Sequence, residues 1–248
     1  MRLAAIYNLW CGEELLPGSI ACIRDHIDHI IIVYQEVSNY GEARDPVFYL
    51  EPTFFNDEKI TFINYRWNPS LRPRHSEIAK RNLGLESARL KGCTHFLHMD
   101  TDEFYEDFGA AKKLYEDRGA AGSVCRLHTY FKKPTWRLEV QEGYFVPFIH
   151  ELHAHTRAGE REYPYYVDPT RRINESDVKE IPIDMHHFSW VRKNITRKAN
   201  NSTAKANIEA GTLMQEYGKC TGPGYYVEAY KSKLIEVPDT FNLSPIFK

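Results

Sequence analysis

The stretch of sequence that decides the fold is Thr94-His95-Phe96-Leu97-His98-Met99-Asp100-Thr101-Asp102-Glu103-Phe104. Its first half is largely apolar and predicts a short buried strand, which leads directly into acidic residues. In an open α/β sheet, ligands bind beyond the carboxyl ends of the strands. Because residues two apart in an extended chain point to the same side, Asp100 and Asp102 are expected to face one spot at such an end.

Two carboxylates that face one spot repel each other unless a cation or a proton lies between them. Hard oxygen ligands suit Mg²⁺ or Mn²⁺, which keep water molecules and complete their coordination with substrate phosphates. The sequence therefore predicts a divalent metal site at Asp100 and Asp102. The competing interpretation is that Asp102 or Glu103 only caps the next helix, because an isolated Asp-x-Asp is a common pattern.

Composition limits the class of protein. The chain has 248 residues, 42% of them hydrophobic, which is enough for one α/β domain with a substantial core. A formal net charge of −2 gives no positive field for binding nucleic acid, and no apolar run is long enough to span a membrane. Five cysteines without a Cys-x-x-Cys pair, and a start without a secretory signal, predict a reduced, cytoplasmic protein.

Strands and helices are expected to alternate through the first hundred residues. Apolar runs predict strands over 3–9, 29–34 and 60–65, and helical periodicity predicts helices over about 13–24 and 75–90. The run at 29–34 is a continuous β-branched stretch, which is typical of a parallel strand buried on both faces. The alternation predicts a mostly parallel, doubly wound sheet flanked by helices.

The second half of the chain has a different pattern. Strands are predicted over 122–130, 144–149, 181–190 and 234–238, with a turn at 132–136, an aromatic loop at 163–168 and one long helix from Val191 to about Tyr217. No internal repeat or linker interrupts the sequence. The prediction is therefore a single domain over residues 1–248.

Several motifs resemble those of family 2-like glycosyltransferases with the GT-A fold. They are Ile6-Tyr7-Asn8 with Glu13-Glu14-Leu15-Leu16-Pro17, the run Asp28 to Ile32, and Lys80 to Gly84 followed by Lys91 to Phe104. The late segment His187-Phe188-Ser189-Trp190-Val191-Arg192 resembles the histidine motif that often completes the metal site in that family. The resemblance implies a GT-A-type, Rossmann-like domain, a nucleotide-diphosphate-sugar donor, Mn²⁺ or Mg²⁺ on the diphosphate, and transfer of the sugar to a hydroxyl of a glycan or other acceptor.

The resemblance also divides the chain and assigns donor contacts. It implies that residues 1–104 bind the nucleotide and that residues 105–248, with the C-terminal helix, bind the acceptor. The expected donor contacts are Tyr7, Asn8, Trp10, Glu13, Gln35, Lys80, Asn82, Asp100, Thr101, Arg192 and Lys198. Gln35 stands where the family frequently has an aspartate, which leaves the base open. Asn82 lies on the apolar stripe of its helix, and either a ligand or backbone could satisfy its amide.

His187 is the expected third protein ligand of the metal. Strand alternation places His187 on the same side as Ile181 and Met185, and His186 on the opposite side. If the apolar side faces the core, His187 is the last residue on that side. It then lies at the end of the strand, close to the buried site. A basic cluster that begins at Arg192 follows, for which a solvated helix face is the competing interpretation.

An inverting transfer also needs a general base for the acceptor hydroxyl. The candidates for this role in the second half are Glu151, Asp168, Glu175, Asp177 and Asp184. Glu151 follows the predicted strand at 144–149 and is preferred, and Asp168 ends the aromatic loop.

Two other functions compete with sugar transfer. Glu151, His153 and His155 share parity and could face one zinc ion, which would make the protein a zinc-dependent hydrolase. However, no His-Glu-x-x-His motif accompanies them. A non-catalytic module that binds nucleotide or carbohydrate is the second alternative, and it would make the acidic pair incidental.

Overall fold

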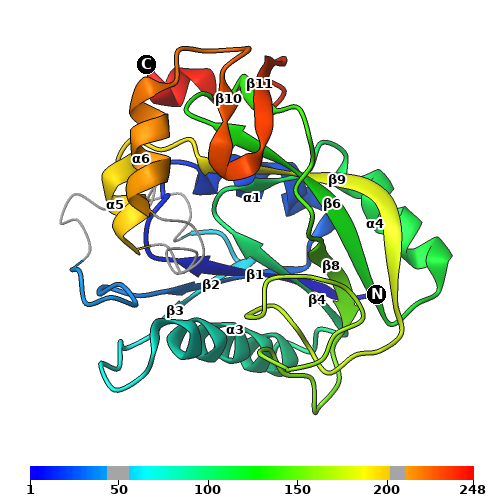
Figure 1. Cartoon of the computed structure of the whole chain (residues 1–248). Coiled ribbons are helices and arrows are strands. Elements are labelled where there is room, and N and C mark those ends of the chain that lie inside the picture. Colours follow the sequence, from blue (N-terminus) through cyan, green and yellow to red (C-terminus); the bar gives the residue numbers. More distant parts are fainter. Residues whose placement is uncertain (44–55, 202–209) are drawn as a thin grey trace.

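The computed structural model describes residues 1–43, 56–201 and 210–248 (Figure 1). The strands are β1 (Leu3–Leu9), β2 (His29–Tyr34), β3 (Ile60–Asn64), β4 (His95–Asp100), β5 (Glu103–Phe104), β6 (Gly122–Phe131), β7 (Trp136–Leu138), β8 (Val146–Glu151), β9 (Val178–Trp190), β10 (Tyr226–Val227) and β11 (Ser232–Glu236). The helices are α1 (Leu16–Ile23), α3 (Pro73–Leu90), α4 (Phe108–Arg118), α5 (Ile195–Asn201) and α6 (Ala210–Lys219). Short 3-10 helices are η1 (Arg24–His26), η3 (Glu228–Tyr230) and η4 (Ser244–Phe247).

All the described strands belong to one mixed sheet. Its order is β10-β11-β7-β6-β8-β4-β1-β2-β3, with β9 paired to β6 and β5 paired to β9. β1 pairs in parallel with both β2 and β4, and β2 pairs in parallel with β3. β8 runs antiparallel between β4 and β6. The predicted α/β class, with a parallel centre and flanking helices, is confirmed, although the second half of the sheet is largely antiparallel.

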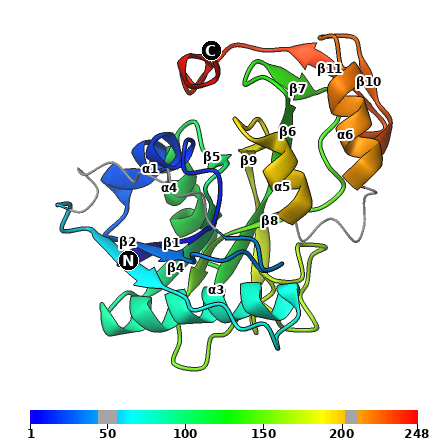
Figure 2. The same cartoon turned by 90° about the vertical axis from the view of Figure 1, so that its left-hand side faces the viewer.

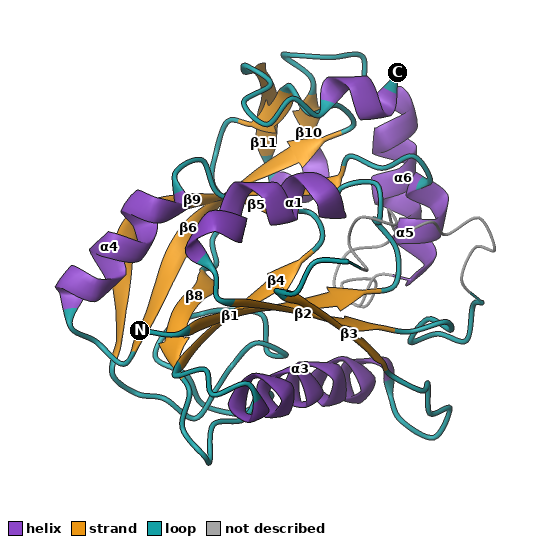
Figure 3. Ribbon diagram, turned by 180° about the vertical axis from the view of Figure 1, so that it is seen from behind, coloured by secondary structure: helices purple, strands orange, loops and turns teal. Residues whose placement is uncertain are grey.

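Helices cover both faces of the parallel strands (Figures 1 and 3). Leu3 and Ala5 pack in the cluster that contains α1 and α4, whereas Ala4 and Ile6 pack against α3, as the alternation of a strand requires. α3 approaches β1 closely at Gly84, where an added Cβ would lie 2.2 Å from Cγ2 of Ile6. Only glycine is therefore compatible with this contact between α3 and the sheet.

Two helices differ from the sequence prediction in their bounds. α1 begins at Leu16 rather than near residue 13, because a turn in which Leu15 N–H donates to the Gly12 carbonyl (3.0 Å) precedes it. The long helix predicted from Val191 is wrong at its start, since residues 191–194 are not helical and α5 begins at Ile195. Its middle, residues 202–209, lies outside the described residues.

The elements α4, β5 and β7 were not predicted. α4 has a clear local start, because the side chain of its N-cap Asp107 accepts a hydrogen bond from Ala110 N–H at 2.9 Å. β5 and β7 have two and three residues, too few to show a strand period. Their pairing with β9 and with β6 and β11, rather than local pattern, defines them.

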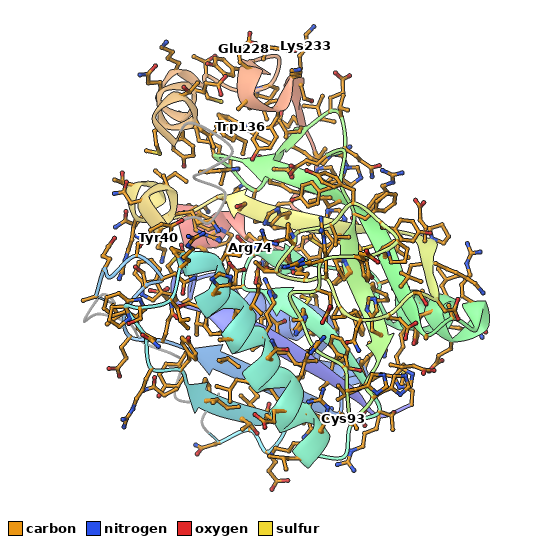
Figure 4. The ribbon with its side chains drawn as sticks, turned by 60° about the horizontal axis from the view of Figure 1, so that its bottom comes forward. Tyr40, Arg74, Cys93, Trp136, Glu228 and Lys233 are labelled. Atoms are coloured by element: carbon orange, nitrogen blue, oxygen red, sulfur yellow. The ribbon has the colours of Figure 1, made fainter. Side chains whose placement is uncertain are left out.

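The C-terminal elements cover one end of the sheet. β10 and β11 form a hairpin that pairs with β7, and α6 lies beside this hairpin (Figure 2). Trp136 of β7 lies beneath the hairpin, with Glu228 and Lys233 at its outer end (Figure 4). Figure 4 also shows Arg74 near one end of α3 and Cys93 near the other. Within the described residues, no helix combines the length and the apolar character needed to cross a bilayer.

Candidate functional site

A pocket lies at the carboxyl ends of the parallel strands. β1, β2 and β4 all end at this edge of the sheet because they run in the same direction. The pocket is also lined by the first half of α3 and by the segment from β9 into α5. Its lining includes Asn8, Trp10, Gln35, Lys80, Asp100, Thr101, Asp102, Arg192 and Lys198. These nine residues belong to the set expected from the sequence. The pocket is also lined by five residues that were not predicted, namely Cys11, Ser38, Asn39, Glu77 and Asn201.

Asp102 is the most buried acidic group of the pocket, with its side chain 2% exposed. Its Oδ2 accepts hydrogen bonds from the guanidinium of Arg192 and from Lys198 Nζ, the latter at 3.3 Å. Burial alone would raise the pKa of Asp102, but Lys198 and Arg192 hold it well below its usual range. The carboxylate is therefore ionised and keeps two cations at the edge of the pocket.

Asp100 belongs to a second, deeper network of charges. Its Oδ2 accepts from Arg171 Nη2 at 2.7 Å, and its Oδ1 accepts from Arg81 Nη2 at 3.3 Å. Arg171 also donates to both oxygens of Glu103, with Nη1 3.1 Å from Oε2. Arg81 in turn donates to Glu77, one turn earlier on α3. The two guanidinium groups fix the Asp100 carboxylate, which remains 33% exposed toward the pocket.

The residues present do not fit the predicted Mn²⁺ or Mg²⁺ set of Asp100, Asp102 and His187. Both oxygens of Asp100 already accept from guanidinium groups, and Oδ2 of Asp102 is occupied by Arg192 and Lys198. A divalent ion would have to displace these cations and would be repelled by them. Throughout residues 1–43, 56–201 and 210–248, no three His, Cys, Asp or Glu side chains form a group that could hold a metal.

His187, and not His186, is the histidine that faces the acidic pair. Its Nε2 lies 3.7 Å from Asp102 Oδ2, and burial lowers its pKa to about 4, so the imidazole is neutral at pH 7. His186 instead pairs with the hydroxyl of Tyr130 at 2.8 Å and with Glu106 at 3.5 Å. Strand alternation therefore predicted the orientation of both rings, while the role of His187 as a metal ligand stays a prediction.

Polar groups without hydrogen-bond partners also line the pocket. Both amide atoms of Asn8, Nε1 of Trp10 and Oε1 of Gln35 are buried and have no hydrogen-bond partner among the described residues. Such atoms cost free energy unless a ligand or water satisfies them. Lys80 adds a buried cation, because burial lowers its pKa only to about 8 and leaves it charged at pH 7.

Three predicted donor contacts lie outside the pocket. The prediction for Tyr7 is wrong, because the residue is buried in the core and its hydroxyl pairs with Ser19 Oγ at 3.0 Å. The ligand contact of Asn82 is also wrong, because its Nδ2 donates to the Ala158 carbonyl (3.3 Å) and its Oδ1 accepts from Ala158 N–H (2.8 Å). Glu13 is half-buried near the pocket but does not line it.

The catalytic candidates Glu151 and Asp168 lie in different places. The register of β8 pairs Glu151 with His95, the first residue of β4, whereas Asp100 is the last residue of that strand. This separation is incompatible with a role for Glu151 at the pocket. Asp168 is closer, since Arg171 N–H donates to its carbonyl at 2.9 Å, but its Oδ1 accepts from Thr170 N–H at 2.8 Å and forms a turn.

The zinc alternative lacks its ligand set. Glu151 Oε2 lies 3.1 Å from His153 Nε2, and the rings of His153 and His155 stack with their centroids 5.6 Å apart. The side chains of Glu151 and His153 are more than 40% exposed, and no three-ligand group occurs in the described part of the chain. A pair of exposed stacked histidines does not make a zinc hydrolase.

The network that holds Asp100 was not predicted from the sequence. Its members are Glu77, Arg81, Glu103, Thr170 and Arg171. The spacing of Glu77 and Arg81 on one helix is the single local signal, because residues four apart on a helix are neighbours. Arg171 is 71 residues from Asp100 in the sequence, so no local pattern relates the two.

Comparison with known proteins yields distant likenesses only. No family model and no curated protein sequence matches the chain. The crystal structure of S. aureus TarS 1–349 aligns with 10% identity and a TM-score of 0.49, over 88% of this chain and 78% of that one. The same fragment in complex with UDP aligns with 11% identity and a TM-score of 0.39, over 52% of this chain and 36% of that one.

A third likeness is to mannose-1-phosphate geranyltransferase from Thermus thermophilus. It has 14% identity and a TM-score of 0.32, and covers 62% of this chain and 51% of that one. The aligned part spans only about a third of the UDP complex and about half of this enzyme. At these scores the likenesses do not assign an activity.

Proposed function

We propose that the protein is a glycosyltransferase that uses a nucleotide-diphosphate-sugar donor. The observation that carries the proposal is one pocket that combines unpartnered polar and aromatic groups with cationic groups. Asn8, Trp10 and Gln35 offer unpartnered hydrogen-bonding atoms for a base and ribose. Arg192 and Lys198 offer positive charge for a diphosphate at the same edge of the sheet.

The cationic groups of the pocket can stabilise the leaving group. When the bond from the anomeric carbon to the phosphate oxygen breaks, the electron pair and the negative charge remain on the nucleoside diphosphate. Asp102 holds Arg192 and Lys198 beside the pocket before donor binds, so their charge needs little reorganisation during the reaction. Lys80, from α3, adds a third cation to the pocket lining.

Asp100 is placed to orient the donor sugar. Its carboxylate is held by Arg171 and Arg81 but is one-third exposed to the pocket, so it can accept hydrogen bonds from sugar hydroxyls. In this arrangement the acidic pair acts through hydrogen bonds and by holding side-chain cations. Metal dependence stays a prediction from the sequence.

The acceptor is a hydroxyl compound, with a glycan as the expected class. A cytoplasmic location also stays a prediction.

A module that binds the nucleotide without transferring a sugar is distinguished by measuring release of nucleoside diphosphate, since such a module would bind the donor without cleaving it.

The proposal predicts a nucleotide-specific rise in melting temperature. We expect one nucleoside diphosphate, among those of uridine, guanosine, adenosine, cytidine and thymidine, to stabilise the protein. At a concentration of about 100 times Kd the gain is about 2.7 kcal/mol, which corresponds to roughly 5–10 °C for a chain of this size. The shift should persist in EDTA because side chains supply the positive charge.

Nucleoside monophosphates and free nucleosides serve as controls for the thermal-shift panel, and each should stabilise less than its diphosphate. The absence of a shift with every diphosphate and every corresponding nucleotide-sugar would contradict the proposed function. A shift that requires Mn²⁺ and disappears in EDTA would instead restore the metal site predicted from Asp100, Asp102 and His187.

A further inference from the structure

A carboxylate that the sequence did not single out lies beside the site. Glu142 is half-buried in the segment between β7 and β8, and its Oε1 accepts a hydrogen bond from Thr129 Oγ1. Thr129, on β6, pairs in register with His187 on β9. His187 Nε2 lies 3.7 Å from Asp102 Oδ2. Glu142 is therefore joined to the Asp102 cluster through one pair of neighbouring strand residues.

The register of β8 directs the segment that precedes it, which contains Glu142, toward the end of β4 where Asp100 lies. β8 runs antiparallel to β4, with Leu97 opposite Ile149, and β8 begins at Val146. Continuing this register, the residues just before Val146 lie beyond the carboxyl end of β4. Tyr144 occupies this position. The charges of Glu142 and of Arg171, the residue that binds Asp100, both act on the pKa of its phenol. The segment of Glu142 and Tyr144 therefore lies near the carboxyl end of β4, in addition to the connection through Thr129 and His187.

The other carboxylates near the site are each engaged by a cation or by a turn. Burial raises the pKa of Glu103 to about 7, but Arg171 donates to both of its oxygens, and Arg81 donates to Glu77. Asp100 and Asp102 are held by guanidinium and ammonium groups, which keep the pKa of each well below its usual range. The Oδ1 of Asp168 is engaged by Thr170 N–H. Burial, by contrast, raises the pKa of Glu142, and the hydrogen bond from Thr129 lowers it. A raised pKa makes a carboxylate a stronger base.

We propose that Glu142 is the general base that accepts the proton of the acceptor hydroxyl. This inference rests on the proposed function. The acceptor oxygen forms a bond to the anomeric carbon, the bond from that carbon to the phosphate oxygen breaks, and the electron pair leaves with the nucleoside diphosphate. The acceptor proton passes to a carboxylate oxygen of Glu142. The result is a single displacement with inversion at the anomeric carbon.

Donor and acceptor then approach from different elements. The nucleotide pocket is lined by the ends of β1, β2 and β4, by α3 and by the β9–α5 segment, whereas Glu142 lies outside that lining, between β7 and β8. The titratable groups that face Glu142 are the phenols of Tyr144, on its own segment, and of Tyr230, on η3. Both phenols are neutral near pH 7, because burial raises the pKa of each.

The test compares Glu142→Gln with the wild-type chain. The rate measured is release of nucleoside diphosphate from the nucleotide-sugar that gives the largest thermal shift, with water as the acceptor. We expect Glu142→Gln to lower this rate by about 10²–10⁴-fold, the usual contribution of a general base, with nucleotide Kd unchanged within about twofold. The control is Glu139→Gln, an exposed residue of the same segment, which should keep the wild-type rate.

A second variant tests the base without removing it. Thr129→Val deletes the hydrogen bond that lowers the pKa of Glu142, so the acidic limb of the pH–rate profile should move to higher pH. An unmoved limb, or a Glu142→Gln rate within about threefold of wild type, would overturn the inference. A large loss in Asp168→Asn with a small one in Glu142→Gln would do the same. A wild-type chain that binds no nucleotide would contradict the proposed function instead, so the two failures are distinguishable.

Discussion

Replacing Lys198 with alanine is expected to weaken binding of the nucleoside diphosphate about 10- to 100-fold. Lys198 Nζ lies 3.3 Å from Asp102 Oδ2 at the pocket wall, and its side chain is 21% exposed, so it can turn from the carboxylate to a phosphate. A hydrogen bond to a charged group contributes about 1.5–3 kcal/mol, which is one to two powers of ten in Kd. Folding should be little affected, because Arg192 still neutralises Asp102.

The measurement is calorimetric titration of the nucleoside diphosphate into both proteins. Lys193→Ala is the matched control, because Lys193 is exposed, carries the same charge and lies five residues earlier in the chain. It should keep the wild-type Kd within about twofold, the range expected for screened surface charges. Equal losses in the two variants would indicate a general effect of net charge, and an unchanged Kd in Lys198→Ala would remove Lys198 from the donor site.

Replacing Arg171 with methionine is expected to lower the free energy of unfolding by about 3–5 kcal/mol, the cost of breaking a buried ion pair by removing one partner. Arg171 and Glu103 have side chains that are 4% and 3% exposed, and Arg171 also binds Asp100. The substitution leaves Glu103 buried without its main counter-charge. In thermal unfolding the melting temperature should fall by roughly 10 °C.

Arg172→Met is the control for the Arg171 variant. Arg172 is adjacent in the chain but only half-buried, and its Nη1 donates to the Arg161 carbonyl at 2.8 Å. A second test adds Glu103→Gln to Arg171→Met, which removes the uncompensated charge and should recover part of the stability. A loss below about 1 kcal/mol in Arg171→Met would show that the network is not a buried structural pair.

The site residues that could be predicted from sequence are those that lie at the ends of individual strands. Asn8, Gln35 and Asp100 lie at or just after the ends of apolar runs, and parallel pairing brings those ends to one edge. The same reasoning gave a wrong prediction for Tyr7, because the alternation of side chains along β1 directs Tyr7 toward the core. The prediction of Glu151 as the general base was wrong because β8 runs antiparallel to β4. The sequence of β8 does not reveal this direction.

The rest depends on contacts between distant segments. The positions of Arg171 and Glu142 follow from the register of β8 and from the segment around residues 168–171, which comes back to β4. The cations on Asp100 and Asp102 come from α3, from that segment and from the β9–α5 connection. An acidic pair alone predicts a metal, and only its three-dimensional neighbours show that cationic side chains lie against both carboxylates.

The direct test of the nucleotide pocket is a crystal structure of the protein grown in EDTA with the stabilising nucleoside diphosphate. We expect the diphosphate to lie within hydrogen-bonding distance of Lys198 Nζ and the Arg192 guanidinium, with the base beside Trp10 and Gln35. These are the cationic and the unpartnered polar groups of the pocket. A nucleotide bound at another edge of the sheet, or a diphosphate that contacts neither Lys198 nor Arg192, would contradict the proposed site.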